Sequence, residues 1–356
     1  MARLLRLLKW LSLSVVLFVV VLLIPVGYVE TFCKAEPEDQ AFAPQITEPA
    51  FVRAEANSYL TYPEWHIVYA YEGLANVMKL SDEHAFGYTR SVVGFWASFC
   101  ALNREADRHG GADAATRRTI HVIGVSFTLE MGMKALYEET VGRLFALLRG
   151  AEKSPQDLYA LTMAEDYGRF LHQTPWYKYD FDGSVGKLWA EPVTSLRSWE
   201  RRLALGGEWK AKAAYADVIA SAVAATGQAQ LTIRSLVSGI PAADLRAMPD
   251  VTVIEERGDN GVLIETPRYR AFTVILRQIA ERNGTVLEVA GNDDIMVSAL
   301  APSAPSQLGY ATVIADINRD GFTGRRLLLQ AKVRDLSLLF TELKSAGFEL
   351  EHVYDY

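Results

Sequence analysis

A line of polar residues runs through an otherwise apolar stretch between residues 113 and 149. Ser126, Glu130, Lys134 and Glu138 follow one another at four-residue steps, so they share one face of a helix. Carboxylates and an ammonium group at this spacing form ordinary ion pairs, and we interpret the line as the solvent-exposed edge of a central helix. If the line faces inward instead, Glu130 and Lys134 are buried charges and candidate ligand-binding groups.

Glu165 and His172 form a second possible polar site. They lie seven residues apart on one face of an expected helix, just before the aromatic run Trp176-Tyr-Lys-Tyr-Asp-Phe181. A carboxylate, an imidazole and an aromatic wall could bind a small ligand. The simpler interpretation is a helix end followed by a packed aromatic connection. Glu105 and His109 also share a helix face, and we interpret them as a solvated pair.

A third candidate resembles half of a calcium-binding loop. Asp316, Asn318 and Asp320 place oxygen atoms at the first, third and fifth positions, and Gly321 occupies the sixth. The twelfth position should carry a bidentate Glu, but Leu327 stands there. We therefore expect a hairpin turn, with metal binding by the three oxygen side chains as the alternative.

Other features exclude functions more than they indicate them. The sequence contains no G-x-S-x-G elbow, Gly-rich phosphate loop, H-E-x-x-H or C-x-x-C motif, and no cofactor is expected. The formal net charge is −7 and no long basic block follows residue 10, which argues against nucleic acid as a partner. Cys33 and Cys100 are the two cysteines. Because Cys100 lies in an apolar stretch, we expect a buried thiol and no disulfide, although an exported compartment would permit one.

The N-terminal segment predicts attachment to a lipid bilayer. Residues 10–29 carry no charge, and about 20 apolar helical residues cross a hydrocarbon core of about 30 Å. Arg3, Arg6 and Lys9 precede the run, so the N-terminus should be cytoplasmic and everything after residue 30 should lie on the exported side, periplasmic or extracellular. The alternative is a cleaved signal peptide, for which Cys33-Lys34-Ala35 is only a passable cleavage site.

The rest of the chain divides by its hydrophobic period. Residues 31–58 contain prolines and charges without a sustained period and resemble a linker, and no internal repeat is visible. Residues 59–228 predict an all-α domain and residues 229–356 an α+β domain. Helices are expected near 62–79, 81–107, 113–149, 154–174, 195–226, 268–282 and 335–346, and strands near 251–255, 262–266, 286–290, 295–300, 311–315, 326–333 and 348–354.

The expected fold is therefore α+β, with a transmembrane helix, a helical domain and an antiparallel α+β sandwich. The order of strands and helices suggests two helices covering one face of a sheet, as in a ferredoxin-like core with extra strands. That is a topological analogy and implies no function. The aromatic residues of the helical domain should pack in its core, and the alternative is a helical domain that rests on the membrane.

We expect a membrane-anchored protein of the cell envelope with a non-enzymatic role as a scaffold or interaction protein. Its partners would be the bilayer, through residues 10–29, and another envelope protein. The alternative is an enzyme or small-ligand binder. A deep polar pocket of the helical domain that joins Glu130, Lys134, Glu165 and His172 would favour that alternative.

Overall fold

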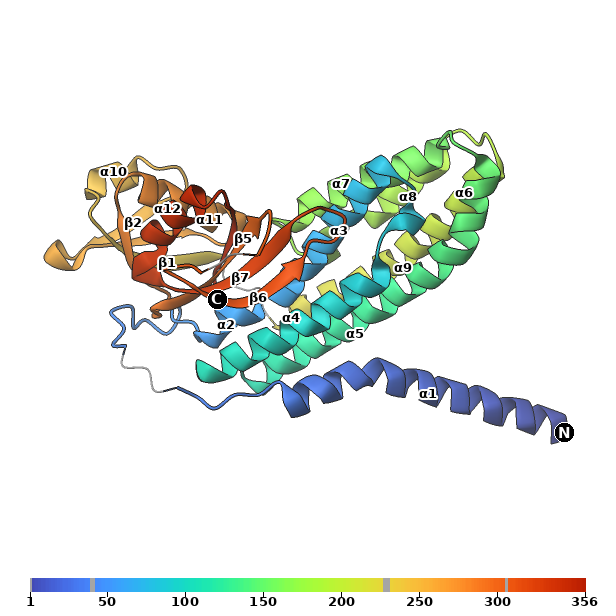
Figure 1. Cartoon of the computed structure of the whole chain (residues 1–356), viewed down its shortest axis with the longest axis horizontal. Coiled ribbons are helices and arrows are strands. Elements are labelled where there is room, and N and C mark those ends of the chain that lie inside the picture. The colour runs from blue at the N-terminus through green and yellow to red at the C-terminus, as the bar shows by residue number, and fades with distance from the viewer. Residues whose placement is uncertain (1, 39–41, 227–230, 305–306) are drawn as a thin grey trace.

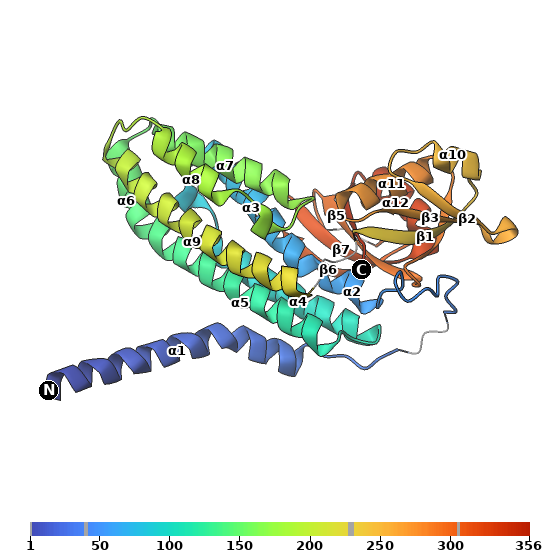
Figure 2. The same ribbon diagram turned by 180° about the vertical axis from the view of Figure 1, so that it is seen from behind.

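The chain folds into an N-terminal helix, an elongated helical bundle and two antiparallel sheets (Figure 1). Helix α1 (Ala2–Phe32) contains a segment, Ser12–Phe32, that is long and apolar enough to cross a membrane or to be a signal sequence. The sheets lie at one end of the bundle, and α1 projects away from them (Figure 2). The computed structural model describes residues 2–38, 42–226, 231–304 and 307–356.

Most of the expected helices are present in the bundle. The helix expected from residue 81 begins at Tyr88 instead, and helix α8 (Phe181–Ala190) was not expected. The stretch 113–149 is one continuous helical segment, but a π-helical turn interrupts its α-helical pitch. The elements are α2 (Ala56–Leu60), α3 (Tyr62–Leu80), η1 (Glu83–Ala85), α4 (Tyr88–Arg108), α5 (Ala114–Tyr137), η2 (the π turn, Glu138–Gly142), α6 (Arg143–Arg149), α7 (Pro155–Leu171), η3 (Trp176–Lys178), α8 (Phe181–Ala190) and α9 (Leu196–Thr226).

Two helix starts follow directly from local sequence. The carboxylate of Asp113 accepts hydrogen bonds from the backbone N–H groups of Ala115 and Thr116, so α5 begins there. Ser154 and Asp157 bond reciprocally in a capping box at the start of α7, with a proline in its first turn. The first cap fixes the start of α5, and the second fixes the start of α7 directly after the connection from α6.

The packing of α4 on α5 sets the rotation of α5. Phe95 of α4 packs against Phe127 of α5, and Phe99 packs against Phe95 in the same core. At Gly124 a Cβ atom would come within 2.7–2.9 Å of the rings of Phe95 and Trp96, so only glycine allows this approach. The face of α5 that carries Gly124 and Phe127 is therefore held inside the bundle.

This rotation overturns our interpretation of the polar line on α5. Lys134 and Glu138 are 9% and 3% exposed, and Glu130 is half-buried. The line faces the interior of the bundle and is not a solvent-exposed edge. The helical period showed that these residues share a face, but an even apolar distribution around the rest of α5 left the direction of that face undetermined.

The C-terminal part contains two four-stranded antiparallel sheets instead of one. Strand β1 (Thr232–Ser238) was not expected, although it occupies a central position in the first sheet. The order is β2-β3-β1-β4 in one sheet and β6-β7-β5-β8 in the other, so the two repeat one strand order. The elements are β1 (Thr232–Ser238), α10 (Ala242–Arg246), β2 (Thr252–Glu256), η4 (Gly258–Asn260), β3 (Val262–Pro267), α11 (Arg270–Glu281), β4 (Thr285–Val289), β5 (Asp294–Ala301), β6 (Thr312–Asn318), β7 (Arg325–Lys332), η5 (Val333–Asp335), α12 (Leu336–Ser345) and β8 (Glu349–Tyr354).

The second sheet is buried on both faces. On one face, α11 and α12 contact each other and strands of both sheets, and Val297, Leu329 and Val353 join that core. On the other face, Met296 and Tyr354 belong to the core of the helical bundle. The sheet is thus part of the bundle's packing and not a separate layer joined only by a linker.

Our expectation about the cysteines is wrong, because Cys33 and Cys100 form a disulfide. Cys33 follows the last turn of α1, and Cys100 lies on the side of α4 that faces it. Further bonds support the joint: Asn103 donates to the carbonyl of Cys33 at 2.7 Å, and Glu30 contacts His121 of α5 at 2.7 Å. The end of α1 is therefore fixed to the bundle by a covalent bond and polar contacts.

Candidate functional site

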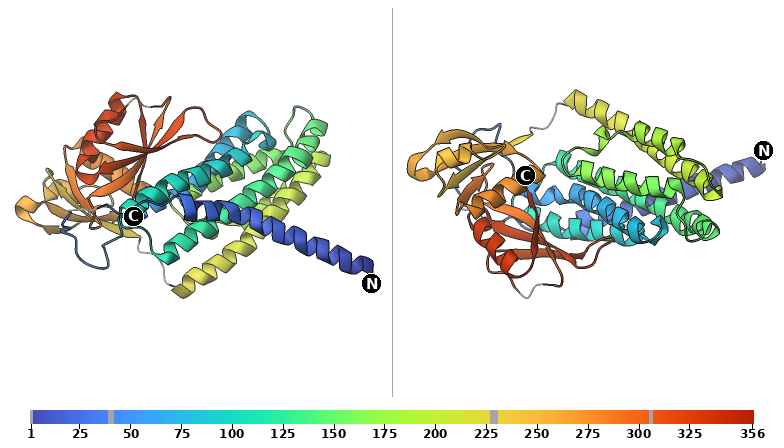
Figure 3. Two further views of the ribbon diagram at one scale, coloured as in Figure 1. Left: turned by 60° about the horizontal axis from the view of Figure 1, so that its bottom comes forward. Right: turned by 90° about the horizontal axis from the view of Figure 1, so that it is seen from above.

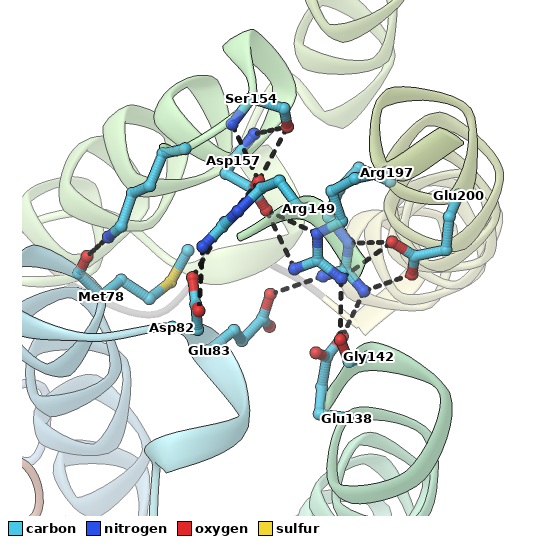
Figure 4. Close-up of polar contacts among 12 residues, drawn as sticks. Met78, Asp82, Glu83, Glu138, Gly142, Arg149, Ser154, Asp157, Arg197 and Glu200 are labelled. Atoms are coloured by element: carbon cyan, nitrogen blue, oxygen red, sulfur yellow. Dashed lines mark hydrogen bonds and ion pairs between the residues drawn. The ribbon is translucent and has the colours of Figure 1, made fainter. Parts of the chain in front are cut away.

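A network of buried charges fills the end of the bundle where η1, η2, α7 and α9 meet (Figure 4). Arg201 of α9 is 1% exposed, although arginine is rarely buried without partners. Its guanidinium contacts three carboxylates at 2.5–3.1 Å, which are those of Glu83, Glu138 and Glu200. Each carboxylate comes from a different element or turn, so Arg201 ties η1, η2 and α9 together.

Two further arginines, Arg149 and Arg197, extend the network to α7. Asp157 lies between Arg197 and Arg149, accepting from the former at 2.9 Å and from the latter at 2.8 Å. Burial opposes ionisation of Asp157, but the two guanidinium groups outweigh it and lower its pKa to about 2. Arg149 also forms a two-point contact with Asp82, at 3.0 and 3.1 Å.

Two lysines continue the network toward the middle of the bundle. Lys134 lies between Glu83 and Glu208, at 2.9 Å from each. Lys212 contacts Glu130 at 2.8 Å and Glu208 at 3.2 Å. Burial opposes the charge on Glu208, but the two ammonium groups lower its pKa to about 2. Because Glu83 contacts both Lys134 and Arg201, the arginine and lysine parts form one network.

Glu138 is the carboxylate that the network satisfies least. Its Oε1 accepts from Arg201 at 2.8 Å, but its buried Oε2 has no partner among the described residues. That oxygen lies against Gly142, where a Cβ atom would come within 2.2 Å of it. Burial and the charge of Glu83 outweigh Arg201 and Lys134 and raise the pKa of Glu138 to about 7. Both residues belong to the π turn, a geometry that is frequent at functional sites.

This pKa predicts how the stability of the protein depends on pH. The folded pKa of Glu138 is above its ordinary value of 4.5, so between those values the folded state holds a proton that the unfolded state releases. The free energy of unfolding should therefore fall as pH rises from about 5 to 8, by up to about 3 kcal/mol. Glu138→Gln should remove this slope and stabilise the protein at pH 8. Urea unfolding across this range measures it.

The neighbouring residue supplies a matched control. Glu139 is exposed on the same turn, so Glu139→Gln should leave the slope unchanged. An equal slope in the parent and in Glu138→Gln would contradict the assignment of the proton to Glu138. The low pKa values of Asp157 and Glu208 act in the opposite direction, and their contribution is lost as pH falls from about 4 toward 2.

The space beside the network is small. A cavity of about 20 Å³ is lined by Tyr71, Lys134, Glu208 and Lys212, among others. Room for a single water needs about 10–15 Å³, whereas pockets for small ligands measure about 300–1,000 Å³. A larger surface depression, of about 500 Å³, adjoins Lys34, Asp107 and Arg117 where α1 meets α4 and α5. The cavity that adjoins the two lysines of the network therefore has room for about one water molecule.

The structure gives different partners to the two members of each pair that the sequence suggested as ligand-binding residues. Glu130 and Lys134 both join the network but bind different partners, Lys212 in one case and Glu83 in the other. Glu165 pairs with Lys79 at 2.6 Å. His172 hydrogen-bonds to Glu72, and its ring lies 5.5 Å from that of Trp65.

The residues of the candidate calcium loop also have separate partners. Asp316 and Asn318 both accept from Arg325, at 2.7 and 2.6 Å. Asp320 is buried against the bundle, 4.0 Å from His66, and the turn packs so closely on α3 that Gly321 nearly touches Gly73. The three oxygen side chains do not converge on one point in this arrangement. The turn instead joins the second sheet to the bundle.

A different group of residues could hold a metal ion. Glu55, His109 and Asp294 each offer a ligand atom, and these atoms lie within 4.8 Å of one another. The Nδ1 atom of His109 is 2.8 Å from the carbonyl of Glu105, which directs Nε2 toward Asp294. The ammonium group of Lys332 contacts Asp294 at 2.5 Å and therefore already supplies a positive charge to this cluster. Our interpretation of Glu105 and His109 as a solvated pair is wrong, because both side chains are buried.

Sequence reasoning missed the arginines of this site. Arg197 and Arg201 stand in the run SLRSWERRL, where they alternate with Leu196, Trp199 and Leu203. This spacing places the arginines on one face of the helix and the apolar residues on another, and the two faces could have been recognised from the sequence. Comparison with known protein families, with curated proteins and with solved structures finds no match to this chain.

Proposed function

We propose that this chain is a membrane-anchored scaffold or interaction protein of the cell envelope and that it is not an enzyme. Helix α1 would cross the bilayer with Arg3, Arg6 and Lys9 on the cytoplasmic side, and the bundle and sheets would lie on the exported side. The sheets would contact another envelope protein. The bundle would hold them at a defined place relative to the bilayer.

The state of the buried charges is the observation that carries this proposal. A catalytic or ligand-binding side chain needs an unoccupied hydrogen-bonding or coordination position that points into a space large enough for a substrate. In the described residues the cations of the network are each held by carboxylates, and the adjoining cavity has room for about one water. Such a network rigidifies a fold. The alternative of an enzyme or ligand binder would need the bundle to open.

The joint between α1 and the bundle supports the proposed location. Disulfides persist in exported compartments and are rare in the cytosol. Cys33 and Cys100 form one next to the end of the apolar segment, where the exported side would begin. A scaffold also benefits from this joint, because a single flexible linker would let the body rotate freely about its anchor.

The first sheet is the part most suited to contact a partner. The order β2-β3-β1-β4, with α10 and α11 as connections, supports a ferredoxin-like description of this sheet, and the fold itself implies no activity. Its edge strand β2 lies at the end of the molecule away from the bundle (Figure 1). Ile254 is 41% exposed there, at a shift in the pairing register with β3.

Photo-crosslinking in living cells tests the scaffold role. With a crosslinking amino acid at Ile254, we expect a discrete adduct with one envelope protein. The same substitution at Thr162, which is exposed on α7, is the control. This variant should be expressed and anchored as well as the Ile254 variant but should give no adduct. A tightly retained small molecule in the purified protein, with no protein adduct at Ile254 or at other exposed positions of the sheets, would favour the ligand-binding alternative instead.

A further inference from the structure

Helix α5 departs from the usual distribution of polar and apolar residues, because it buries charged side chains beside apolar ones such as Phe127 and Met131. Between residues 119 and 138 its charged side chains point into the bundle, as described for Lys134 and Glu138. The exposed positions of the same stretch are Thr119, Val122, Leu129, Gly132, Met133 and Leu136, none of which carries a charge. Leu136 is 73% exposed, whereas Lys134, two residues earlier, is 9% exposed. A helix in water normally buries the former and exposes the latter.

The first two turns of helix α9, next to α5, show the same departure. Arg197 and Arg201 are almost fully buried, while Leu196 and Leu203 are 72% and 64% exposed. The two helices run antiparallel and join through ion pairs such as Lys134 with Glu208, which lie on their inner sides. Helical spacing places Leu129, Met133 and Leu136 on one side of α5, and Leu196 and Leu203 on one side of α9. We define the outer apolar face by Leu129, Met133, Leu136, Leu147, Leu196 and Leu203.

The position of α1 identifies what covers this face. We propose that the outer apolar face lies on the same lipid bilayer that α1 crosses, partly immersed in its outer leaflet. His121, which contacts Glu30 of α1, lies about two helical turns before Leu129 on α5, so the face begins about two turns from the anchor. From this joint α1 and the bundle extend toward the same side of the molecule, away from the sheets, in each view of Figures 1 to 3. A bilayer around α1 therefore meets the bundle.

Physical chemistry favours lipid as the occupant. Soluble monomers rarely expose contiguous apolar patches larger than a few hundred Å². Ionisable residues in contact with a membrane face the interior of a bundle and pair with one another, which is the arrangement of Arg201 and its partners. At the end of the face, Trp189 and Trp199 are half-exposed, with the guanidinium of Arg202 5.4 Å from each ring. Tryptophan and arginine are side chains of the membrane–water interface.

Fluorescence quenching in vesicles tests the position of the face. The full-length protein, with a fluorophore on a single introduced cysteine, is reconstituted into vesicles of phosphatidylcholine and phosphatidylglycerol with or without brominated acyl chains. Leu136→Cys and Leu147→Cys report on the face, Thr162→Cys on an exposed position of α7, and Val16→Cys on the anchor. All four positions are exposed, so each variant should keep the parent melting temperature.

We expect brominated lipid to quench the probes at residues 136, 147 and 16 at least about twofold more than the probe at residue 162. Iodide in the aqueous phases should show the opposite order. Equal iodide quenching at residues 136, 147 and 162 would overturn the proposal. So would a face that is shielded from iodide but not quenched by lipid, since a second copy or another protein would then cover it.

The proposal rests on the membrane anchoring that the proposed function assumes, and the probe in α1 separates the two. If the probe at residue 16 is not quenched by lipid, the anchor itself fails. If it is quenched and the probes at residues 136 and 147 are not, the anchor stands and the lipid contact of the bundle is refuted.

Discussion

Replacement of Arg201 by Met should destabilise the protein by about 4 kcal/mol. Removing one partner of a buried ion pair typically costs about 3–5 kcal/mol, because the opposite charge stays buried without compensation. Arg201 compensates three carboxylates at once, and its side chain is 1% exposed. Met has a similar length and no charge, so the loss reflects electrostatics more than a cavity. Urea unfolding at pH 7 measures the change.

Arg169 provides the matched control. It is exposed and pairs with Asp166 on the surface of α7, so Arg169→Met should change the free energy of unfolding by less than about 1 kcal/mol. Adding Glu138→Gln to Arg201→Met should recover part of the loss, because one unpaired carboxylate is then neutral. A loss below about 1 kcal/mol for Arg201→Met would show that water reaches the network.

Reduction of the disulfide should lower the stability of the protein by up to about 4 kcal/mol. In the chain-entropy account this is the value for a bond between residues 67 positions apart. In intact cells, neither Cys33 nor Cys100 should react with a thiol reagent until a reductant is added. Unfolding with and without reductant, together with gel-shift labelling, measures both effects.

A variant with both cysteines replaced by Ser controls for other effects of the reductant. Its stability should match that of the reduced parent and should not respond to reductant. Free thiols at residues 33 and 100 in untreated cells would contradict both the pairing and the proposed exported location.

The sequence predicted those features that depend on neighbouring residues. The charge-free run 10–29 lies within α1, whose span is long and apolar enough to cross a membrane, because length and composition alone decide this property. The starts at Asp113 and Ser154 were visible because a cap bonds to its own first turn. Most strands flanked by turn sequences were also found in this way.

Features that depend on the direction of a face were not predicted. On α5, the period placed Glu130 and Lys134 together, but nothing in the sequence showed that the charged side faces inward. We assumed that the charged side of the helix faces water, whereas the structure places it inside the bundle. The same assumption concealed Arg197 and Arg201, whose alternation with leucines resembles an ordinary amphipathic helix.

Contacts between distant segments were equally out of reach. Cys100 is on a helix and Cys33 follows one, and only the docking of α1 on α4 brings them together. Strand β1 pairs with β3 and β4, neither of which is next to it in the chain, so no hairpin turn marked it. The expectation of one sheet failed for a related reason, since strand order is not encoded in local period.

The disulfide also changes what a cut in the backbone would do. A peptidase that cleaved after Ala35, at the passable site Cys33-Lys34-Ala35, would leave Cys33 on the anchor side of the cut. The bond to Cys100 would still join that fragment to the rest of the molecule. The product would be a two-chain protein that remains at the membrane under oxidising conditions and separates in a reducing gel. Its release would then be controlled by thiol chemistry and not by proteolysis.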